Sequence, residues 1–493
     1  MRERAATLRG VRISVKAAGL FLRPEDAPRG CAPKMCAGNE RSVWGSLASC
    51  AVNPPEPLDV PALDAPDPLE WNAMDYPNLL ETAFDEFSAA PAVATVPAVV
   101  TVPAAGNDAG AVTAGDSAGA PRLLIWRQIR WSNRRPLIEV EPVVPGGAIG
   151  GVAERANSRA SQAAGEGAPV PEQLGVPSGV RIQIPLTPGA YLGLRIPRDS
   201  EGELYRYCAG YTTGVSGDAA PDAASESAPK SGVTSAGIRR VPCPEGARIQ
   251  RGQQCPRCTA RDEFTALHSA HLYPGTLTES MRAYAMLEHR LYIATFPDGT
   301  HKVGTSSLHS TPRRLDEQAV ATATYIALAP DGLTIRRAED AVTALAKIPQ
   351  VKQMASKYRA WTNPLPGAQL RAAHQEAVAR AREALAELVR TEPEVPLTAL
   401  DEPWIPSLAM NRPYAALRAQ SPEPLAPCDS GLSDSGTESG AAGFFCTGAA
   451  GQFLSAHTGD ADAAFLVNTA AWRNVLVEPA QEFTRVRVQG SLF

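Results

Sequence analysis

The stretch Leu291-Tyr-Ile-Ala-Thr-Phe-Pro-Asp-Gly-Thr-His-Lys-Val-Gly-Thr305 decides the fold of the central part of the chain. Apolar, β-branched and aromatic residues dominate its first six positions, and Pro297-Asp-Gly-Thr300 is typical of a tight turn. His301-Lys-Val-Gly-Thr305 then resumes a strand pattern. The stretch therefore predicts two antiparallel strands joined by that turn.

The residues around this hairpin predict helices and one further strand. In order, the expected elements are a helix over 281–289, the two strands, a helix capped by Thr311 that runs to Val320, a strand over 324–329, and a helix over 334–348. The core order is therefore ββαβα. A helix over 369–389 follows, with Ala and Leu on one face and charges elsewhere, which favours a packing helix.

A small antiparallel β domain is expected before this core. Its strands are predicted over 123–131, 136–143, 180–184 and 191–196. The turn Thr187-Pro-Gly-Ala190 lies between the last two, which predicts a hairpin. Further strands near the C-terminus should pack back on this domain, because three short strands alone seldom form a stable unit.

Composition divides the chain into folded and low-complexity segments. Of 493 residues, 40 are Gly and 44 are Pro, and residues 51–120 contain eleven acids and no Lys or Arg, which keeps such a segment unfolded. The predicted class is α+β with long disordered segments. The expected segments are a disordered acidic, Pro- and Ala-rich tail over 1–120, the small β domain with a flexible insert over 121–212, a linker over 213–240, a cysteine-containing segment over 241–275, the ββαβα core plus helix over 276–391, a Pro-, Ser- and Gly-rich linker over 392–440, and C-terminal strands over 441–493.

Charge and hydropathy limit the partners. A net charge of −5 and a pI near 5.9 argue against a protein that coats nucleic acid along its whole length, although a local basic patch is compatible with them. The longest apolar stretch, 90–105, is broken by three prolines, so no membrane span is expected.

The basic first 22 residues suggest a transit peptide, a disordered extension or a start codon placed too early. Nine cysteines without framework spacing favour reduced thiols and a cytoplasmic location.

One island in the acidic tail has helical spacing. The segment from Trp71 to Phe87 mixes acids with Leu79, Leu80 and Phe84. It suggests an amphipathic segment that docks on a protein partner. The alternative is a fragment of nascent helix without a partner.

Four cysteines precede the core and suggest a structural zinc site. They are Cys208, Cys243, Cys255 and Cys258, and the last two form a Cys-x-x-Cys turn that lets two thiolates bind one tetrahedral ion. His268 and His271 offer a second combination with that pair. Unliganded thiols are the alternative, and redox catalysis is disfavoured because no thioredoxin-like βαβ pattern surrounds the pair.

Several side chains of the predicted ββαβα unit suggest phosphate chemistry. Tyr292, Arg313, Arg314 and Glu339 come from three successive elements. In a single-metal phosphodiesterase a carboxylate holds a divalent ion, a guanidinium stabilises developing charge and a phenol positions water. Each residue also has an ordinary explanation, as a strand aromatic, a surface arginine or a solvated glutamate.

The same residues carry a family resemblance. Leu291-Tyr-Ile-Ala, His301-Lys-Val-Gly-Thr305, Pro312-Arg-Arg-Leu315 and Arg337-Ala-Glu-Asp340 resemble the motifs of the GIY-YIG nuclease superfamily. With the cysteine segment, they also resemble a bacterial family of unknown activity, domain of unknown function 2797. The resemblance implies a Mg²⁺ or Mn²⁺ ion on Glu339 and a nuclease-like site. In this chain Lys302 stands where an active nuclease keeps its second tyrosine, and the first motif reads Leu-Tyr-Ile.

Local charge points to DNA or RNA as a partner. Residues 301–360 hold nine basic and five acidic side chains, and Lys302, Arg336 and Arg337 are the predicted phosphate contacts. The sequence thus supports two hypotheses. One is a nucleic-acid-binding or metal-dependent phosphodiesterase-like protein, and the other is a zinc-stabilised scaffold that has lost nuclease activity.

Overall fold

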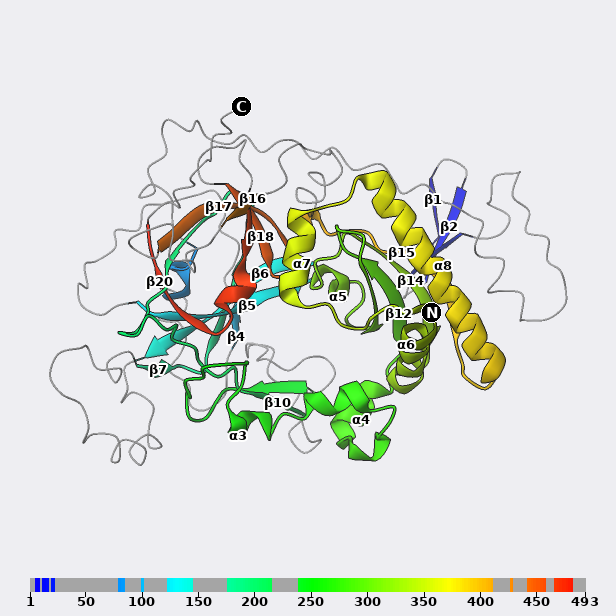
Figure 1. The fold of residues 1–493 in the computed structure, drawn as a ribbon, viewed down its shortest axis with the longest axis horizontal. Helices are drawn as coiled ribbons and strands as arrows, with labels where there is room; N and C mark the ends of the chain where they lie inside the picture. Colours follow the sequence, from blue (N-terminus) through cyan, green and yellow to red (C-terminus); the bar gives the residue numbers. More distant parts are fainter. Residues whose placement is uncertain are drawn as a thin grey trace. The chain divides into compact units, whose positions relative to one another are not determined.

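The computed structural model (Figure 1) describes part of the chain. The described residues are 5–8, 11–16, 19–22, 79–84, 99–101, 122–144, 175–214, 238–410, 426–428, 441–457 and 465–481. Most of the predicted acidic tail, the inserts 145–174 and 215–237, and most of the linker 411–440 lie outside them. Residues Met1–Ser46 form one compact unit, in which β1 (Ala5–Leu8), β2 (Val11–Lys16) and β3 (Gly19–Leu22) pair antiparallel.

The second unit, Leu47–Phe493, contains helices and antiparallel sheets, as the predicted α+β class requires. A four-stranded sheet has the order β13-β12-β14-β15. Its strands are β12 (His289–Thr295), β13 (His301–Ser307), β14 (Thr322–Ala329) and β15 (Thr398–Pro403). Its helices are α5 (Arg313–Asp316), α6 (Gly332–Ala346), α7 (Met354–Thr362) and α8 (Gly367–Thr391), and α6 and α8 pack on the strands (Figure 1).

Strand β12 is buried on both faces, which explains its continuous apolar run. Tyr292 and Phe296 belong to a core cluster that also contains Trp126 of the larger sheet. Successive side chains of a strand alternate, so Leu291 and Ile293 face the other way, toward α6 and α8. One apolar core thus joins the two sheets.

The sequence signals the N-terminal cap of α6 correctly but not that of α5. Asp331 caps α6 by accepting a hydrogen bond from the Thr334 N–H at 2.7 Å. The helix expected from Thr311 to Val320 is wrong in extent, since α5 covers only Arg313–Asp316. Thr311 does not cap it; its hydroxyl donates to the Ser307 carbonyl at 3.2 Å instead.

The larger sheet collects strands from both ends of the unit. Its order is β16-β19-β18-β17-β9-β20-β5-β6-β8-β4, with β7 on β6. The strands are β4 (Val99–Thr101), β5 (Leu124–Ser132), β6 (Arg135–Val144), β7 (Val176–Pro177), β8 (Arg181–Pro185), β9 (Tyr191–Arg195), β16 (Ala426–Cys428), β17 (Ala441–Ala450), β18 (Phe453–His457), β19 (Phe465–Asn468) and β20 (Val475–Pro479). Strands β17 and β20 hydrogen-bond to β9, and β20 also pairs with β5.

The hairpin predicted from 180–184 and 191–196 is wrong. Strand β8 pairs with β6 and β4, whereas β9 pairs with β17 and β20. The turn between them is present, but three strands lie between β8 and β9 in the sheet. Partners distant in the sequence therefore override the local hairpin signal.

The remaining elements are short, and several of them lie in the part of the chain that carries the cysteines. Strands β10 (Tyr211–Gly214) and β11 (Ile238–Val241) form an antiparallel pair, and α3 (Pro256–Thr259) and α4 (Glu279–Ala285) follow. Short 3-10 turns occupy Phe264–Ser269, Pro274–Thr276, Leu408–Met410 and Thr469–Trp472.

Within the described residues, no helix has the length and apolar content needed to cross a membrane.

The island predicted as a docking segment is partly used inside the chain. Leu80 and Ala83 are fully buried in the core that joins the two sheets, and the Leu79 N–H donates to the Tyr191 carbonyl at 3.1 Å. The rest of the segment from Trp71 to Phe87 lies outside the described residues. Leu80 and Ala83 are therefore not available to a protein partner in this fold.

A buried ion pair links the two sheets. Arg134, in the turn between β5 and β6, donates from Nε and Nη2 to the two carboxylate oxygens of Asp316, both at 2.8 Å. Asp316 lies on α5 and is fully buried, while the Arg134 side chain is 30% exposed. Burial raises the pKa of Asp316, and Arg134 opposes that shift.

We expect Arg134→Ala to lower the free energy of unfolding by about 3 kcal/mol at pH 7, because it leaves a buried carboxylate without its cation. The pKa of Asp316 should then rise further. A folded-state pKa above the unfolded one adds stability at low pH, and this contribution is lost as the pH rises through the folded value. Urea unfolding should therefore show a smaller deficit at pH 5 than at pH 7.

The neighbouring exposed Arg135 gives the matched control, and Arg135→Ala should change stability by less than about 0.5 kcal/mol. The double variant Arg134→Ala/Asp316→Asn should recover part of the loss. A deficit that is the same at both pH values would contradict the buried-carboxylate explanation.

Candidate functional site

The four predicted cysteines converge into one cluster. The Sγ atoms of Cys208, Cys243, Cys255 and Cys258 all lie within 4.8 Å of one another, and those of Cys243 and Cys255 are 4.0 Å apart. A tetrahedral zinc ion with Zn–S bonds of about 2.3 Å places its sulfur ligands about 3.8 Å apart. The cluster can therefore hold a metal ion such as zinc after small inward shifts.

Strand pairing brings the distant cysteines together. Cys208 precedes β10 and Cys243 follows β11, so the antiparallel pair sets these residues side by side whatever the length of the insert between the strands. Gly210 allows this approach, because its φ is +80° and a Cβ there would lie 2.1 Å from the Val241 carbonyl oxygen. The N–H groups of Gly210 and Cys255 donate to the Cys208 sulfur at 3.4 and 3.2 Å, which favours its thiolate.

The thiols of the cluster differ in acidity. A hydrogen bond from Cys208 lowers the pKa of Cys243 to about 5, whereas burial raises the pKa of Cys258 to about 12. The same hydrogen bond and burial raise the pKa of Cys208. Cys243 thus carries the first negative charge, and a metal ion would displace the protons of Cys208 and Cys258.

The second combination, with histidines, does not form. His271 Nε2 lies 2.7 Å from a carboxylate oxygen of Asp340. Burial lowers the pKa of His268, and the charges that act on it are Arg336, Arg314 and Lys302. Among the described residues, the four cysteines are the group with metal-ligand geometry.

Tyr292 lies inside the β12–β13 pair. It is opposite Gly304 in the register, and its side chain is 1% exposed. A Cβ on Gly304 would lie 2.4 Å from the phenol oxygen, so only glycine leaves room for the ring. Burial raises the pKa of Tyr292, which keeps the phenol protonated near neutral pH.

Cationic side chains gather around Glu339. Arg336 donates to the Glu339 carboxylate at 2.5 Å, and both residues lie on α6. Burial, together with the neighbouring charges of Arg314 and Arg336, lowers the pKa of Lys302 to about 8, and Glu339 opposes this shift. Arg314 is also the largest charge acting on Tyr292. Tyr292, Lys302, Arg314, Arg336 and Glu339 therefore share one environment, which we call the cationic site.

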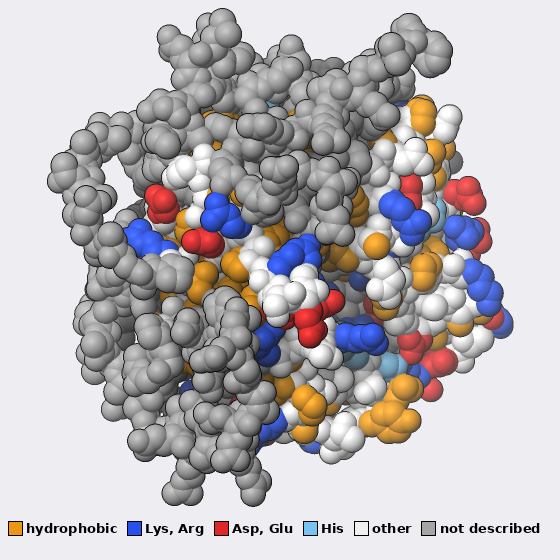
Figure 2. Space-filling model, turned by 60° about the vertical axis from the view of Figure 1, so that its left-hand side comes forward, with side chains coloured by type: hydrophobic (Ala, Val, Ile, Leu, Met, Phe, Trp, Pro, Cys, Tyr) orange, Lys and Arg blue, Asp and Glu red, His pale blue; other side chains and the backbone are white. Residues whose placement is uncertain are grey.

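Two predicted residues point elsewhere. Arg313 pairs with Glu317 at 2.5 Å, and Arg314 contacts the same carboxylate at 3.4 Å, but only Arg314 is among the charges that act on Lys302. Arg337 pairs with Glu392 at the surface, and its side chain is 53% exposed. Figure 2 shows basic and acidic side chains interspersed over the described part of one face.

The cationic site contains a lysine that the sequence analysis missed. Lys357 on α7 is 6% exposed, and its Nζ donates to the Gln318 side-chain oxygen at 2.9 Å. Lys302 donates to the same oxygen at 3.4 Å. Burial and the charge of Lys302 lower the pKa of Lys357 to about 7. The available signal was a lysine on the buried stripe of α7, three and four residues before Ala360 and Trp361.

The cationic site does not fit a Mg²⁺ or Mn²⁺ ion. Those ions need carboxylate or carbonyl oxygens with free lone pairs. Glu339 is 2% exposed, already ion-paired with Arg336, and close enough to Lys302 for that charge to act on it. The charges near Glu339 would repel a divalent cation.

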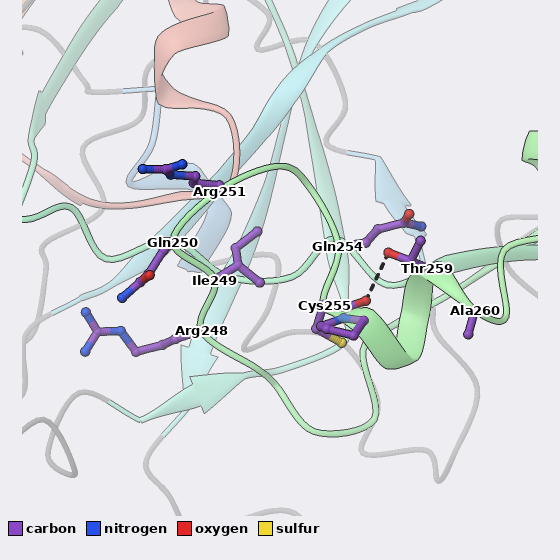
Figure 3. Close-up of a pocket in the computed structure, with 9 residues that line it drawn as sticks. Arg248, Ile249, Gln250, Arg251, Gln254, Cys255, Thr259 and Ala260 are labelled. Atoms are coloured by element: carbon purple, nitrogen blue, oxygen red, sulfur yellow. Dashed lines mark hydrogen bonds between the residues drawn. The ribbon is translucent and has the colours of Figure 1, made fainter.

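A hollow of about 630 Å³ borders the cysteine cluster (Figure 3). Residues 248–251 form one wall, and Cys255 and Thr259 lie on the other. The Thr259 hydroxyl donates to the Cys255 carbonyl at 3.1 Å, which fixes the start of α3. Arg248 lies 4.4 Å over the Tyr205 ring and pairs with Asp199, so its charge is partly neutralised within the chain.

No family model, curated protein or solved structure matches this chain. Function must therefore be argued from the cysteine cluster and the cationic site.

We expect the purified, reduced protein to contain one zinc ion per chain. Cys258→Ser should bring the zinc content close to zero after dialysis against a competing chelator, and should lower the unfolding temperature by several degrees, because metal binding contributes to folding. Atomic absorption and thermal unfolding measure both. Cys446→Ala is the control, since Cys446 is buried in β17 outside the cluster; zinc content should stay at one.

The affinity for zinc should fall steeply with acidity. Cys208 and Cys258 have raised pKa values, so at least two protons leave when the ion binds at pH 7. The apparent dissociation constant should then rise about a hundredfold per pH unit between pH 7 and 6. Competition with a chromophoric chelator measures this slope. A slope near zero would contradict coordination by these thiolates.

Proposed function

We propose that this chain is a zinc-stabilised nucleic-acid-binding protein with a GIY-YIG-like core, and that its cationic site takes a phosphate group without metal-dependent cleavage. The cysteine cluster has a structural role in this proposal, because four thiolates fill a tetrahedral ion and leave no position for substrate.

One observation carries the proposal. Four cationic side chains act on one another in this site: Arg336 and Lys302 act on Glu339, Arg314 contacts Glu317 at 3.4 Å, and the charges of Lys302 and Arg314 act on Lys357, so the cations outnumber these two carboxylates. Burying like charges together costs free energy, and an anionic ligand offsets that cost. Arg314 and Arg336 have side chains that are 40% and 25% exposed, so their guanidinium groups can reach a phosphate at the surface.

The geometry favours binding over hydrolysis. Glu339 is already neutralised, and Tyr292 is buried and protonated. A phenol in that state cannot deprotonate water at neutral pH. The hypothesis of a partner-recruiting scaffold loses its main support, since Leu80 and Ala83 already pack within the chain.

Fluorescence anisotropy with labelled single-stranded, duplex and branched oligonucleotides tests the proposal. Arg314→Gln should weaken binding about tenfold and reduce the salt slope by about one, because one phosphate contact is lost. The exposed Arg359 on α7 provides a charge-matched control, and Arg359→Gln should stay within about twofold of wild type. Thermal unfolding would verify that both variants fold.

Two outcomes would overturn the proposal. Equal losses in both variants would mean that general charge, and not the cationic site, attracts the nucleic acid. Cleavage with Mg²⁺ or Mn²⁺ that disappears in Glu339→Gln would instead support the phosphodiesterase hypothesis.

A further inference from the structure

A second group of charges lies between the larger sheet and the cysteine segment, away from the residues of the cationic site. It has five guanidinium groups and two carboxylates, which we call the charged layer: Arg127, Arg130, Arg181, Arg240 and Arg473 with Glu139 and Glu141. Glu139 and Glu141 are 1% and 2% exposed. Three positive charges therefore have no carboxylate of their own.

Both carboxylates are shared between several donors, although Glu139 Oε1 makes no hydrogen bond and lies 3.5 Å from Arg130. Arg127 pairs with Glu141 at 2.7 Å, and Glu141 also accepts from the Gly179 N–H at 3.0 Å. Arg181 pairs with Glu139 at 3.2 Å, and Gln128 donates to the same carboxylate at 2.8 Å.

Arg240 differs from Arg127, Arg130 and Arg181, which each pair with one of these carboxylates. Its side chain makes no hydrogen bond or ion pair with any residue that the structure describes, and its Nε atom is inaccessible to solvent. The charge of Arg181, followed by burial, lowers the pKa of Arg240 to about 9. A guanidinium held beside other cations without a partner is destabilising unless an anion joins it.

Arg473 is in a similar position. Its Nη2 reaches the Gln128 side-chain oxygen at 3.5 Å, and it has no ion pair with a carboxylate among the described residues. Burial and the charge of Arg181 lower its pKa. The charges of Arg181 and Glu139 act on both Arg240 and Arg473, so these two arginines share a carboxylate that Arg130 and Arg181 already contact.

We propose that Arg240, Arg473 and Arg181 form a binding site for a phosphate group. A guanidinium presents parallel N–H donors that match the oxygens of a phosphate, and a doubly charged phosphate neutralises more of the surplus than a single carboxylate does. The site is independent of the proposed function, since it shares no residue with the cationic site. Arg240 lies on β11, three residues before Cys243, so a bound anion would also brace the cysteine segment against the sheet.

Inorganic phosphate is the direct probe for the full-length, zinc-loaded protein. In wild type, phosphate at constant ionic strength should raise the unfolding temperature, whereas equivalent chloride should not. Arg240→Gln should weaken phosphate binding at least tenfold in calorimetry. Without phosphate and at low salt, Arg240→Gln should raise the unfolding temperature, because it removes like-charge repulsion. Zinc content is measured throughout, since phosphate can compete for the ion.

Arg135→Gln is the matched control, because Arg135 is exposed on β6, the strand that carries Glu139. It should leave phosphate binding unchanged. An oligonucleotide without terminal phosphates forms the second arm. If it binds through Arg240 while free phosphate does not, the site takes a backbone phosphodiester, which still supports phosphate recognition there.

The proposal is overturned if neither probe binds, or if phosphate stabilises wild type and Arg240→Gln equally. It is also overturned if Arg240→Gln lowers the unfolding temperature and leaves phosphate binding intact, since Arg240 would then have a packing role. Failure of these tests leaves the proposed function standing, because oligonucleotide binding through Arg314 is measured separately.

Discussion

Arg127, which pairs with Glu141 on the neighbouring strand, ties the backbone around Cys208 to the larger sheet. Arg127 Nη1 also donates to the carbonyls of Tyr207 and Cys208, both at 3.3 Å, and Arg181 donates to the Ala209 carbonyl at 2.9 Å. Charge-assisted bonds therefore hold the backbone at and on both sides of Cys208, the first cysteine of the cluster. A pair with side chains only 2% and 3% exposed is costly to desolvate, so these extra bonds matter to its stability.

The sequence predicted elements best where local signals and packing agree. The buried run of β12, its Pro-Asp-Gly turn and the Asp331 cap of α6 all lie where local chemistry places them. Strand β15 and helix α7 were missed, because β15 is largely exposed and is set by its pairing with β14, and the buried Lys357 of α7 depends on the distant Gln318 side chain. The separation of β8 from β9 has the same origin, since strand order in a sheet is not encoded in the turn.

For the candidate sites too, local sequence signals predicted some features, and others depended on contacts between distant residues. Cysteine chemistry and the Cys-x-x-Cys turn predict the four candidate metal ligands without the fold, because thiolates are common ligands of zinc. The burial of Lys357, the neutralisation of Glu339 by Arg336 and the lone position of Arg240 are properties of the folded chain. A residue list gives the charges of a site, but only the fold gives their neighbours.

The distribution of charge ties both proposals to one class of ligand. The whole chain carries a net charge of −5, yet the charged layer and the cationic site each hold more cations than carboxylates. Folding must desolvate those guanidinium and ammonium groups without enough carboxylates to pair them, which costs free energy. A chain can sustain that cost where ligand binding offsets it. Phosphate groups meet the requirement at both places, because they bring concentrated negative charge and oxygens that match guanidinium donors.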